Sequence, residues 1–453
     1  MKNIFFKYFI FLAVFNIPGH IAFAQGKEAY EITIEGVKVI VQPSGNEIVE
    51  IQTVIKGGVQ NYPAAKAGIE SLAITALTEC GTEKDDKNSF KNKLDKVSAQ
   101  VYGYSGMDYA SLNMNCIKSD FDVVWPLYAD ALTTPRFDAK EFERIKQDAI
   151  NNIKANESQP DYAIGKYARK LAFAGRNYAK DPEGTEAIVK KLTAAETKTY
   201  YKSVLAKNRI AIVIVGDIDR NMIEKRIREM LKKIPAGQPF VLKKEKYIPA
   251  INTFNSTKKD FATNYIQGIT GAPQPGTPEF NAFMLAMRIF GDKHFIEIRT
   301  KNGLSYAPQA WFDGGLTPTA NIAVSTTDPD KYIAILKALV EKMKKEGFTD
   351  EEVKNEKIGY LTGFYYRQET NGAQASSIAA NEVLHNNWRR ALDIKNDISK
   401  LSTEEVNKAF HKYISNMTWA YMGDPAKVNP KLFTDNNPPA KLPATKLKNT
   451  KKG

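Results

Sequence analysis

Apolar positions along the chain follow two different periods, and the two alternate in blocks. Alternating or continuous apolar runs predict strands over Ile32–Val41, Glu47–Ile55, Gln100–Ser105 and Tyr109–Ile117. A period near 3.6 predicts helices over Gly68–Thr78, Phe121–Leu132 and Ala139–Ala155. Turn residues such as Pro43-Ser44-Gly45-Asn46 join neighbouring strands as hairpins would. The pattern therefore predicts an α+β fold, with largely antiparallel sheets packed against helices, rather than a doubly wound parallel sheet.

The same order of landmarks occurs twice in the chain. Each copy has a segment that opens a long helix, a second segment that caps a later helix with Thr or Ser before an acidic residue, and a strand that ends in Gly-Asp. The copies lie at offsets of 211, 209 and 207 residues, and the pairs are Phe137–Glu141 with Phe348–Glu352, Leu192–Glu196 with Leu401–Glu405, and Gly216-Asp217 with Gly423-Asp424. Three paired landmarks in one order indicate two homologous halves, each of a usual domain size.

This repeat sets the expected domain boundaries. Residues 25–235 form the first domain and residues 251–440 the second. Residues 236–250 are rich in Pro, Gly and Lys and read as a linker, and residues 441–453 as a basic, solvated tail.

The first 24 residues have the order of a secretory signal peptide. Lys2 and Lys7 precede an apolar run from Tyr8 to Ile17, and Ala22-Phe23-Ala24 offers small residues for cleavage. The run is shorter than the roughly 20 residues that span a bilayer. No later stretch is apolar enough for a membrane span. We therefore expect an exported protein, placed in the periplasm in preference to full secretion.

Composition adds little beyond a globular class. The 453 residues are 43% hydrophobic and carry a formal charge of +13. No basic stripe interleaved with aromatic residues accompanies that charge, so a nucleic-acid partner is not expected. Two cysteines, Cys80 and Cys116, could form a disulfide in an oxidising compartment or remain as two buried thiols, and their spacing matches no familiar metal pair.

One segment of the second half combines residues suited to binding. A helical pattern through Phe290 is followed by a Gly291-Asp292 break, and Arg299 then precedes an Asn302-Gly303 turn. A strand-like stretch from Leu304 continues through Tyr306. Arginine offers a planar fork of donors and tyrosine a hydroxyl on a stiff ring, so the two could hold a carboxylate or a backbone carbonyl. A surface arginine beside a half-buried tyrosine is the plainer interpretation of the same spacing.

Together these features resemble the insulinase/pitrilysin superfamily of zinc peptidases, in the branch that includes mitochondrial processing peptidase. The resemblance covers nearly the whole chain after residue 24. It depends on the duplicated halves, on Gly57-Gly58, Ala67-Gly68-Ile69 and Gly81-Thr82 in the first half, and on Arg299–Tyr306 in the second. In that family an Arg and a Tyr flank a Gly-Leu turn at this spacing and help to hold the substrate backbone near the metal.

The family's zinc motif is missing from the position where the resemblance places it. Active members carry H-x-x-E-H on a first-half helix, where two His bind Zn²⁺ and the Glu is the general base. Here the corresponding residues are Ser71, Ile74 and Thr75, and the later Glu falls near Asn152. After residue 24 the first half contains no histidine. The sequence therefore predicts no metal ligand, no catalytic residue and no cofactor in this chain.

Three histidines and several acidic residues of the second half offer alternative sites. His294-Phe-Ile-Glu297 spells part of a metal motif but lacks a third ligand, and a solvent-facing His294 is the favoured interpretation. His385 and His411 read as surface or structural residues. The acids Glu351, Glu352, Glu369 and Glu382 read as solvated helix faces.

The resemblance implies a function shared between two chains. It implies that this protein is the zinc-less, substrate-binding subunit of an exported heterodimeric metallopeptidase, with zinc on a homologous partner subunit and peptides as substrates. Arg299 and Tyr306 would serve the partner's zinc site. The alternative is a catalytically inactive homologue that acts as a structural or peptide-binding protein. A lone peptidase with an unrelated metal site is the least favoured, because the chain has so few ligands.

Overall fold

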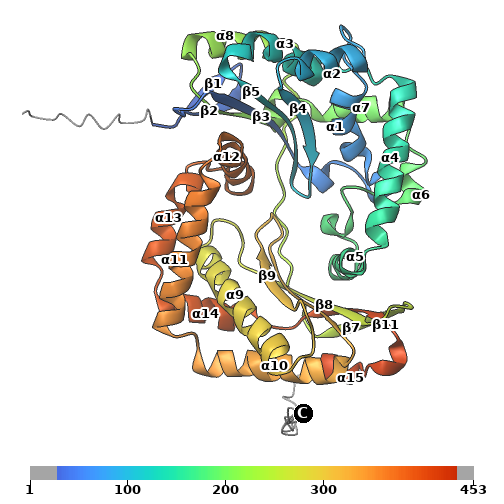
Figure 1. The fold of residues 1–453 in the computed structure, drawn as a ribbon, viewed down its shortest axis with the longest axis vertical. Helices are drawn as coiled ribbons and strands as arrows, with labels where there is room; N and C mark the ends of the chain where they lie inside the picture. The colour runs from blue at the N-terminus through green and yellow to red at the C-terminus, as the bar shows by residue number, and fades with distance from the viewer. Residues whose placement is uncertain (1–27, 436–453) are drawn as a thin grey trace, which may run out of the picture.

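The computed structural model describes residues 28–435, which fold into two halves that face each other. Figure 1 shows the first half above the second, each built from one twisted sheet with helices around it. Each half has its own large apolar core, one centred on residues such as Ile51 and Leu77 and the other on residues such as Phe283 and Ile322. The α+β prediction with two homologous halves is confirmed.

The first half contains a six-stranded sheet in the order β1-β2-β6-β3-β5-β4. The β2/β6 pair is parallel and the other neighbours are antiparallel. Its elements are β1 (Tyr30–Ile34), β2 (Val37–Gln42), β3 (Ile48–Lys56), η1 (Gly58–Asn61), η2 (Ala64–Lys66), α1 (Ile69–Glu79), α2 (Lys87–Asp95), β4 (Gln100–Ser105), β5 (Tyr109–Ile117), η3 (Lys118–Asp120), α3 (Phe121–Thr133), α4 (Ala139–Glu157), α5 (Pro160–Ala172), η4 (Asn177–Ala179), α6 (Glu186–Val189), α7 (Ala194–Val204), η5 (Lys207–Arg209), β6 (Ile210–Val215) and α8 (Arg220–Leu231).

The second half repeats this topology without a counterpart of β1. Its sheet has the order β7-β11-β8-β10-β9, and only the β7/β11 pair is parallel. Strands β2 to β6 therefore correspond in order and direction to β7 to β11. The elements are β7 (Thr253–Lys258), β8 (Asn264–Gly271), α9 (Glu279–Phe295), the π-helical turn η6 (Ile296–Lys301), β9 (Gln309–Asp313), β10 (Thr319–Thr326), α10 (Pro329–Glu346), α11 (Asp350–Arg367), α12 (Asn371–His385), α13 (Arg390–Lys400), α14 (Thr403–Tyr413), β11 (Thr418–Gly423), η7 (Pro425–Lys427) and α15 (Lys431–Thr434).

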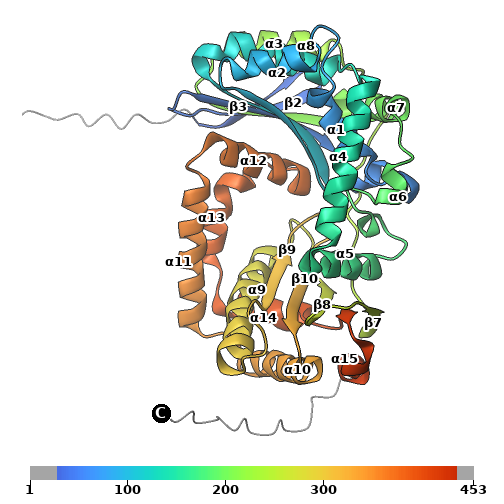
Figure 2. The ribbon, with the colours of Figure 1, turned by 45° about the vertical axis from the view of Figure 1, so that its right-hand side comes forward.

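The two halves exchange one helix each. Helix α5 of the first half packs on β8 and β11 of the second sheet, and α12 of the second half packs on β3 and β6 of the first. Figures 1 and 2 show both helices in the space between the sheets. The apolar contacts of α5 with the second sheet belong to the core of the first half, and those of α12 with the first sheet form a separate cluster. These two sets of contacts hold the halves in position relative to each other.

The repeated landmarks are helix caps and strand ends, as the sequence predicts. Thr349 and Ser402 each form a capping box with the Glu three residues later, opening α11 and α14. Asp138 and Thr193 cap α4 and α7 at the corresponding places in the first half. Each later helix leads to the buried strand, β6 or β11, that lies beside a parallel neighbour.

Three predicted elements differ from the structure. Ile32–Val41 is not one strand, because Glu35 and Gly36 both take positive φ and close a two-residue hairpin between β1 and β2. The helix predicted to break at Gly291-Asp292 continues to Phe295. Gly291 lies against the Ala310 carbonyl, where a side chain would not fit, so this glycine permits close packing and does not end the helix. Residues from Leu304 to Pro308 are not a strand, and β9 begins at Gln309.

Some predictions fall outside the described residues or concern only boundaries. The signal peptide (1–24) lies outside them, as do the tail (441–453) and the last residues of the second domain. Residues 232–252, between α8 and β7, contain no helix or strand, and the proposed limits of the linker stay predictions. None of the helices within residues 28–435 is both long and apolar enough to cross a bilayer.

Candidate functional site

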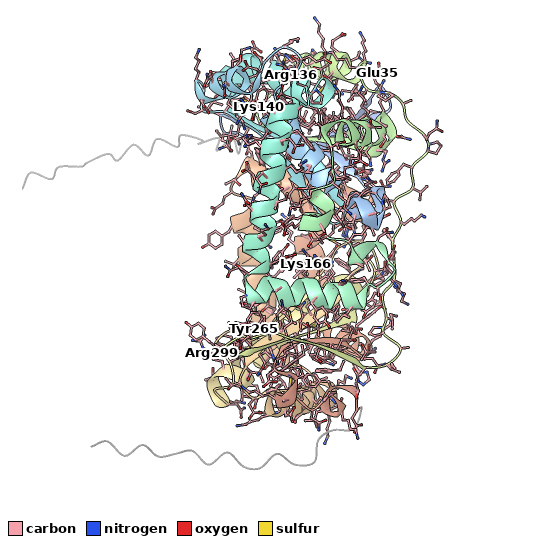
Figure 3. All side chains as sticks on the ribbon, turned by 90° about the vertical axis from the view of Figure 1, so that its right-hand side faces the viewer. Glu35, Arg136, Lys140, Lys166, Tyr265 and Arg299 are labelled. Atoms are coloured by element: carbon pink, nitrogen blue, oxygen red, sulfur yellow. The ribbon has the colours of Figure 1, made fainter. Side chains whose placement is uncertain are left out.

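Arg299 and Tyr306 form a stacked pair at the surface of the second half. The guanidinium carbon of Arg299 lies 4.0 Å from the centroid of the Tyr306 ring and 5.1 Å from that of Phe295. Tyr306 is 78% exposed, and Arg299 is half-buried. Figure 3 places Arg299 on the outside of the second half. Guanidinium N–H groups and the tyrosine hydroxyl therefore remain available to a ligand, since no described side chain accepts from them.

The local backbone fixes this pair. Helix α9 passes into the π-helical turn η6, which carries Arg299, and Ile298 in that turn is fully buried. The amide of Leu304 donates to the Ile298 carbonyl (3.0 Å) and that of Gly303 to the Arg299 carbonyl (3.1 Å). Only Gly303 of the predicted Asn302-Gly303 pair takes a positive φ (+60°). A π turn often marks a functional site, because it changes the direction of a side chain on a rigid helix.

A large cavity adjoins the pair. It has a volume of about 960 Å³ and is lined by residues of α9, β9, α11, α12 and α13, among them Phe295, and by Pro308 before β9. Phe295 therefore both lines this cavity and lies beneath the Arg299 guanidinium. Trp311 and Phe312 give its wall aromatic surface. Its charged lining residues are mixed in sign, and the acids outnumber the bases: Arg288, Arg390, Asp108, Asp292, Asp313 and Glu356. An extended ligand in this cavity could reach the Arg299–Tyr306 pair.

The first-half helix that carries zinc ligands in the family is α1, and here its residues do not fit a metal. Ile74 is buried and packs against the backbone of β4 so closely that a Cβ on Gly103 would lie 2.3 Å from its Cγ2. Ser71 is half-buried, and Thr75 and Asn152 are exposed. Within residues 28–435 no group of three His, Cys, Asp or Glu side chains is arranged to hold a metal ion. An apolar contact thus occupies the place of the family's general base.

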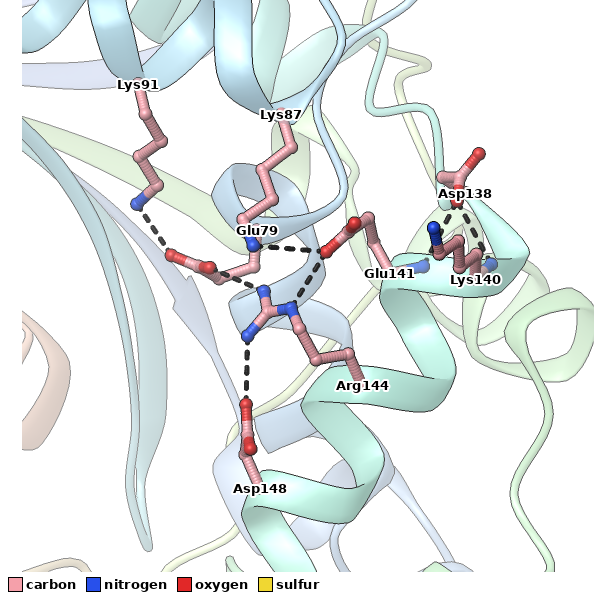
Figure 4. A network of polar contacts seen from close by, with 8 residues as sticks. All are labelled: Glu79, Lys87, Lys91, Asp138, Lys140, Glu141, Arg144 and Asp148. Carbon is pink, nitrogen blue, oxygen red and sulfur yellow. Dashed lines mark hydrogen bonds and ion pairs between the residues drawn. The ribbon is translucent and has the colours of Figure 1, made fainter.

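An ion-pair network joins α1 to α4, the two helices that the resemblance associates with metal ligands. Arg144 on α4 donates to Glu79 on α1 (2.8 Å), to Glu141 (2.8 Å) and to Asp148 (2.9 Å) (Figure 4). Lys91 on α2 also contacts Glu79 (2.6 Å). Burial raises the pKa of Glu79, but the charges and hydrogen bonds of Lys91 and Arg144 outweigh it and hold that pKa below its usual range.

A buried carboxyl group next to the motif position was missed by sequence reasoning. Glu70 is 1% exposed, and its Oε2 accepts from the Tyr200 hydroxyl (2.6 Å) and the Asn61 amide (2.9 Å), while Arg209 donates to Asn61. Burial raises the pKa of Glu70 to about 7, against the lowering effect of these hydrogen bonds. Its position in the apolar pattern of α1 gave no sign of the three polar residues that converge on it from η1, α7 and η5.

A second missed cluster joins the two halves. The Tyr178 hydroxyl donates to Asp108, and the amides of Leu316 and Thr317 donate to Asp108 (3.3 Å) and to the Tyr178 oxygen (3.1 Å). Burial raises the pKa of Asp108 to about 6, opposed by the hydrogen bond from Tyr178. Gly315 lies so close that a Cβ there would meet Asp108 at 2.7 Å and the Tyr178 oxygen at 2.8 Å. The arrangement fixes the β4–β5 hairpin against the loop after β9.

The histidines have structural surroundings. His294 is fully buried rather than solvent-facing, so that expectation was wrong; its Nε2 lies 3.1 Å from the Tyr332 hydroxyl, and burial lowers its pKa to about 3. His385 packs edge-on against Phe280, and burial together with Arg390 and Lys244 lowers its pKa to about 4. His411 is exposed on α14.

Two other sequence expectations are resolved by the structure. Cys80 and Cys116 are free, buried thiols, and burial raises the pKa of each to about 12. Glu382 is not on a solvated helix face. It is buried at the contact between α12 and the first sheet, where Lys38 pairs with it at 2.8 Å and Lys56 at 3.6 Å.

Known proteins resemble this chain over most of its length. The non-peptidase homolog YmxG of Helicobacter pylori is 20% identical over 391 residues, which is 83% of this chain and 89% of that protein. The crystal structure of a peptidase M16 inactive domain from Pseudomonas fluorescens superposes with a TM-score of 0.80 at 18% identity, covering 89% of this chain and 99% of that one.

A longer protein contains a similar unit. The structure of the periplasmic protease PqqL from Escherichia coli matches 93% of this chain with a TM-score of 0.75 and 15% identity, and the match covers 49% of PqqL. At these identities the likeness to solved structures concerns the fold.

Two family models match the sequence in adjacent segments. Residues 38–186 match insulinase (peptidase family M16), and residues 191–360 match the peptidase M16 inactive domain. The matched segments cover most of both halves, including α1 and the Arg299–Tyr306 segment. The chain therefore belongs to the insulinase family, peptidase family M16, as an inactive homologue whose first half lacks the zinc motif.

Proposed function

We propose that this protein is the substrate-binding subunit of a two-chain zinc peptidase in the periplasm. A homologous partner would carry the zinc, and this chain would supply Arg299 and Tyr306 to the partner's site. The observation that carries the proposal is the stacked, solvent-accessible Arg299–Tyr306 pair beside the 960 Å³ cavity. It occurs in a chain whose described residues form no group of three His, Cys, Asp or Glu side chains that could hold a metal ion.

The roles of the two side chains follow from their donors. Arg299 would donate to a substrate carbonyl or a terminal carboxylate, and the Tyr306 hydroxyl to the peptide backbone or the developing oxyanion. The peptide would lie as an added strand on an open sheet edge. Strands β4 and β9 are end strands of their sheets, and β9 starts three residues after Tyr306 and lines the cavity. Such an edge supplies backbone donors and acceptors regardless of side chain.

The periplasmic location depends on the signal-peptide pattern of residues 1–24. It is supported by the periplasmic location of the structurally similar E. coli PqqL.

A non-enzymatic role is the second candidate, and one observation favours it. The H. pylori relative that aligns with 83% of this chain is a non-peptidase homolog. In that role the same cavity would hold a peptide without cleavage.

Co-expression with a secreted homologue that carries H-x-x-E-H separates the two candidates. We expect a single heterodimer peak in size-exclusion chromatography and peptide cleavage that a chelator abolishes. We expect neither chain alone to cleave. Stable complexes that never cleave a peptide library would favour the non-enzymatic role, and chelator-sensitive cleavage by this chain alone would overturn both.

A further inference from the structure

A second cavity, beside α5, has a strongly basic lining. It has a volume of about 1050 Å³ and lies between α5, the η2 turn, the loop from Ala174 to Thr185 and residues 245–246. It shares no lining residue with the cavity beside Arg299. Figure 3 labels Lys166 at α5, and its ammonium pairs with Glu157 at the end of α4 (2.9 Å) and with Asp181 (3.2 Å). The cationic lining residues are Lys166, Arg169, Lys170, Arg176, Lys180 and Lys246.

The positive charge of this cavity is only partly neutralised. Asp181 and Glu245 are its two lining carboxylates, against six cations. Asp181 pairs with Lys166 (3.2 Å) and Arg169 (3.5 Å), and Glu157, which is not a lining residue, also pairs with Lys166 (2.9 Å). Among the described residues no carboxylate forms an ion pair with Lys170 or with Lys246. The cavity wall therefore keeps a net positive charge of several units.

Lys180 is the most buried of the six cations. Its residue is 9% exposed, and its ammonium donates to the Tyr62 carbonyl (2.6 Å) and to the Asn177 side chain (2.8 Å). It also lies 5.3 Å from the Tyr62 ring centroid. An ammonium has three N–H donors, and these two neutral acceptors use two of them. Burial lowers the pKa of Lys180, partly offset by the charge of Glu245.

The other cations are graded from the interior to the solvent. Lys166 and Arg169 are half-buried, whereas Lys170, Arg176 and Lys246 are exposed. Arg176 is held by its bond to the Lys246 carbonyl (2.9 Å) and by its position over the Tyr247 ring (5.7 Å). A ligand with several anionic groups could thus meet Lys180 in the interior and the exposed cations at the opening.

We propose that this cavity binds a small polyanion that carries two or more carboxylate or phosphate groups. One anionic group accepts the third N–H of Lys180, and another lies between Lys170 and Lys246. Charge-assisted hydrogen bonds of this kind are about twice as strong as neutral ones, and a partly enclosed cavity screens them less than open surface does. This site is independent of the Arg299–Tyr306 pair and of the proposed peptidase role.

The test uses the purified protein and two probes, citrate for carboxylates and inorganic pyrophosphate for phosphates. Isothermal titration calorimetry at low salt should give saturable one-site binding of at least one probe, weakened by added salt. Binding of citrate alone identifies a carboxylate ligand, and binding of pyrophosphate alone a phosphate ligand. Absence of saturable binding for both probes overturns the proposal.

Variants locate the site. Lys180→Met should weaken binding at least tenfold, because it removes the buried donor. The double variant Lys170→Gln with Lys246→Gln changes only exposed side chains and should weaken it about threefold or more. Lys191→Gln with Lys202→Gln, both exposed and outside the cavity, should leave affinity within twofold. If Lys180→Met does not fold, the two double variants decide, and equal affinities for them would refute the assignment.

Discussion

Arg299 and Tyr306 are seven positions apart in sequence, yet the arginine's guanidinium lies over the tyrosine ring at 4.0 Å. The buried Ile298 and the glycine turn at Gly303 hold the arginine's end of this contact. Cation–π stacking then orients both polar ends together. The pair should behave as one binding unit, in which loss of the ring also displaces the guanidinium.

The first prediction separates stacking from hydrogen bonding in the reconstituted two-chain peptidase. Tyr306→Phe keeps the ring and removes only the hydroxyl, so kcat should fall on the order of 10²–10³-fold if that hydroxyl serves the oxyanion. Arg299→Lys removes the planar fork and should raise KM, because a point charge replaces a bidentate donor. Thermal unfolding of this chain should be unchanged, since Tyr306 is mostly exposed.

Tyr365→Phe is the matched control, because Tyr365 is also an exposed tyrosine of the second half. Its cleavage rate should equal that of the wild type. Full turnover by the double variant Arg299→Ala with Tyr306→Phe would rule out a role for the pair in cleavage.

The second prediction concerns the contact between the halves at Tyr178. Tyr178→Phe removes the hydroxyl that donates to Asp108 and accepts from the Thr317 amide, leaving two buried polar groups short of a partner. The free energy of unfolding should fall by about 1–3 kcal/mol. Urea denaturation measures it.

Tyr162→Phe serves as the comparison, since its hydroxyl donates to the exposed Glu183 (3.1 Å) and water can replace it. That change should cost less than about 0.5 kcal/mol. Equal losses in the two variants would mean that the Tyr178 hydroxyl does not join the halves.

The sequence predicted those parts of the fold that depend on local pattern. Capping residues such as Thr349 and Ser402 made the internal repeat recognisable, because a helix start favours particular side chains at fixed spacing. The β1–β2 hairpin was missed because its turn uses Glu35 in a left-handed conformation, which that residue type seldom adopts. The exchange of α5 and α12 was also missed, because an apolar helix face does not indicate which sheet it covers.

The residues singled out in the site description also divide into those with a local sequence signal and those without one. Arg299 and Tyr306 could be found because their turn carries a local signature. Glu70 and Glu382 could not be found in this way, because the fold supplies their partners. Glu70 accepts from Tyr200, 130 positions away, as well as from Asn61, and Glu382 accepts from Lys38, 344 positions away. A buried acid and a solvated acid have the same letter in the sequence, and only the distant partners distinguish them.

The third prediction is a pH dependence from Glu70. Its pKa in the folded chain, about 7, is above its ordinary value of 4.5. The folded state therefore holds a proton that the unfolded state has lost between these values, and stability decreases as the pH rises from about 4.5 to about 7. The penalty at pH 8 should be of order 2–3 kcal/mol.

Glu70→Gln should remove this part of the pH dependence, because its amide stays neutral while its oxygen can still accept from Tyr200 and Asn61. Urea midpoints at pH 5 and pH 8 should differ less for the variant than for the wild type. Glu83→Gln, at an exposed position, should retain the wild-type difference. A Glu70→Gln profile that parallels the wild type would show that Glu70 does not titrate in this range.

The fourth prediction tests the ion pair beneath α12. Glu382 has no exposed side-chain surface, and it faces Lys38 at 2.8 Å and Lys56 at 3.6 Å, both partly buried. Glu382→Ala leaves two lysines of the first sheet against a buried helix face without their counter-ion. We expect a loss of about 3 kcal/mol, because breaking one side of a buried pair leaves charge uncompensated. In the variant, amide hydrogen exchange should increase more in α12 than in α11, because Glu382 ties α12 to the first sheet whereas the main packing partners of α11 are α9, α13 and α14 of the second half. Glu404→Ala breaks an exposed pair with Lys408 and should cost less than about 1 kcal/mol. A stability loss for Glu382→Ala no larger than that for Glu404→Ala would contradict this role of the ion pair. Amide exchange in α12 that stays as slow as in the wild type would do the same. In either case the apolar face of α12 alone would hold it on β3 and β6.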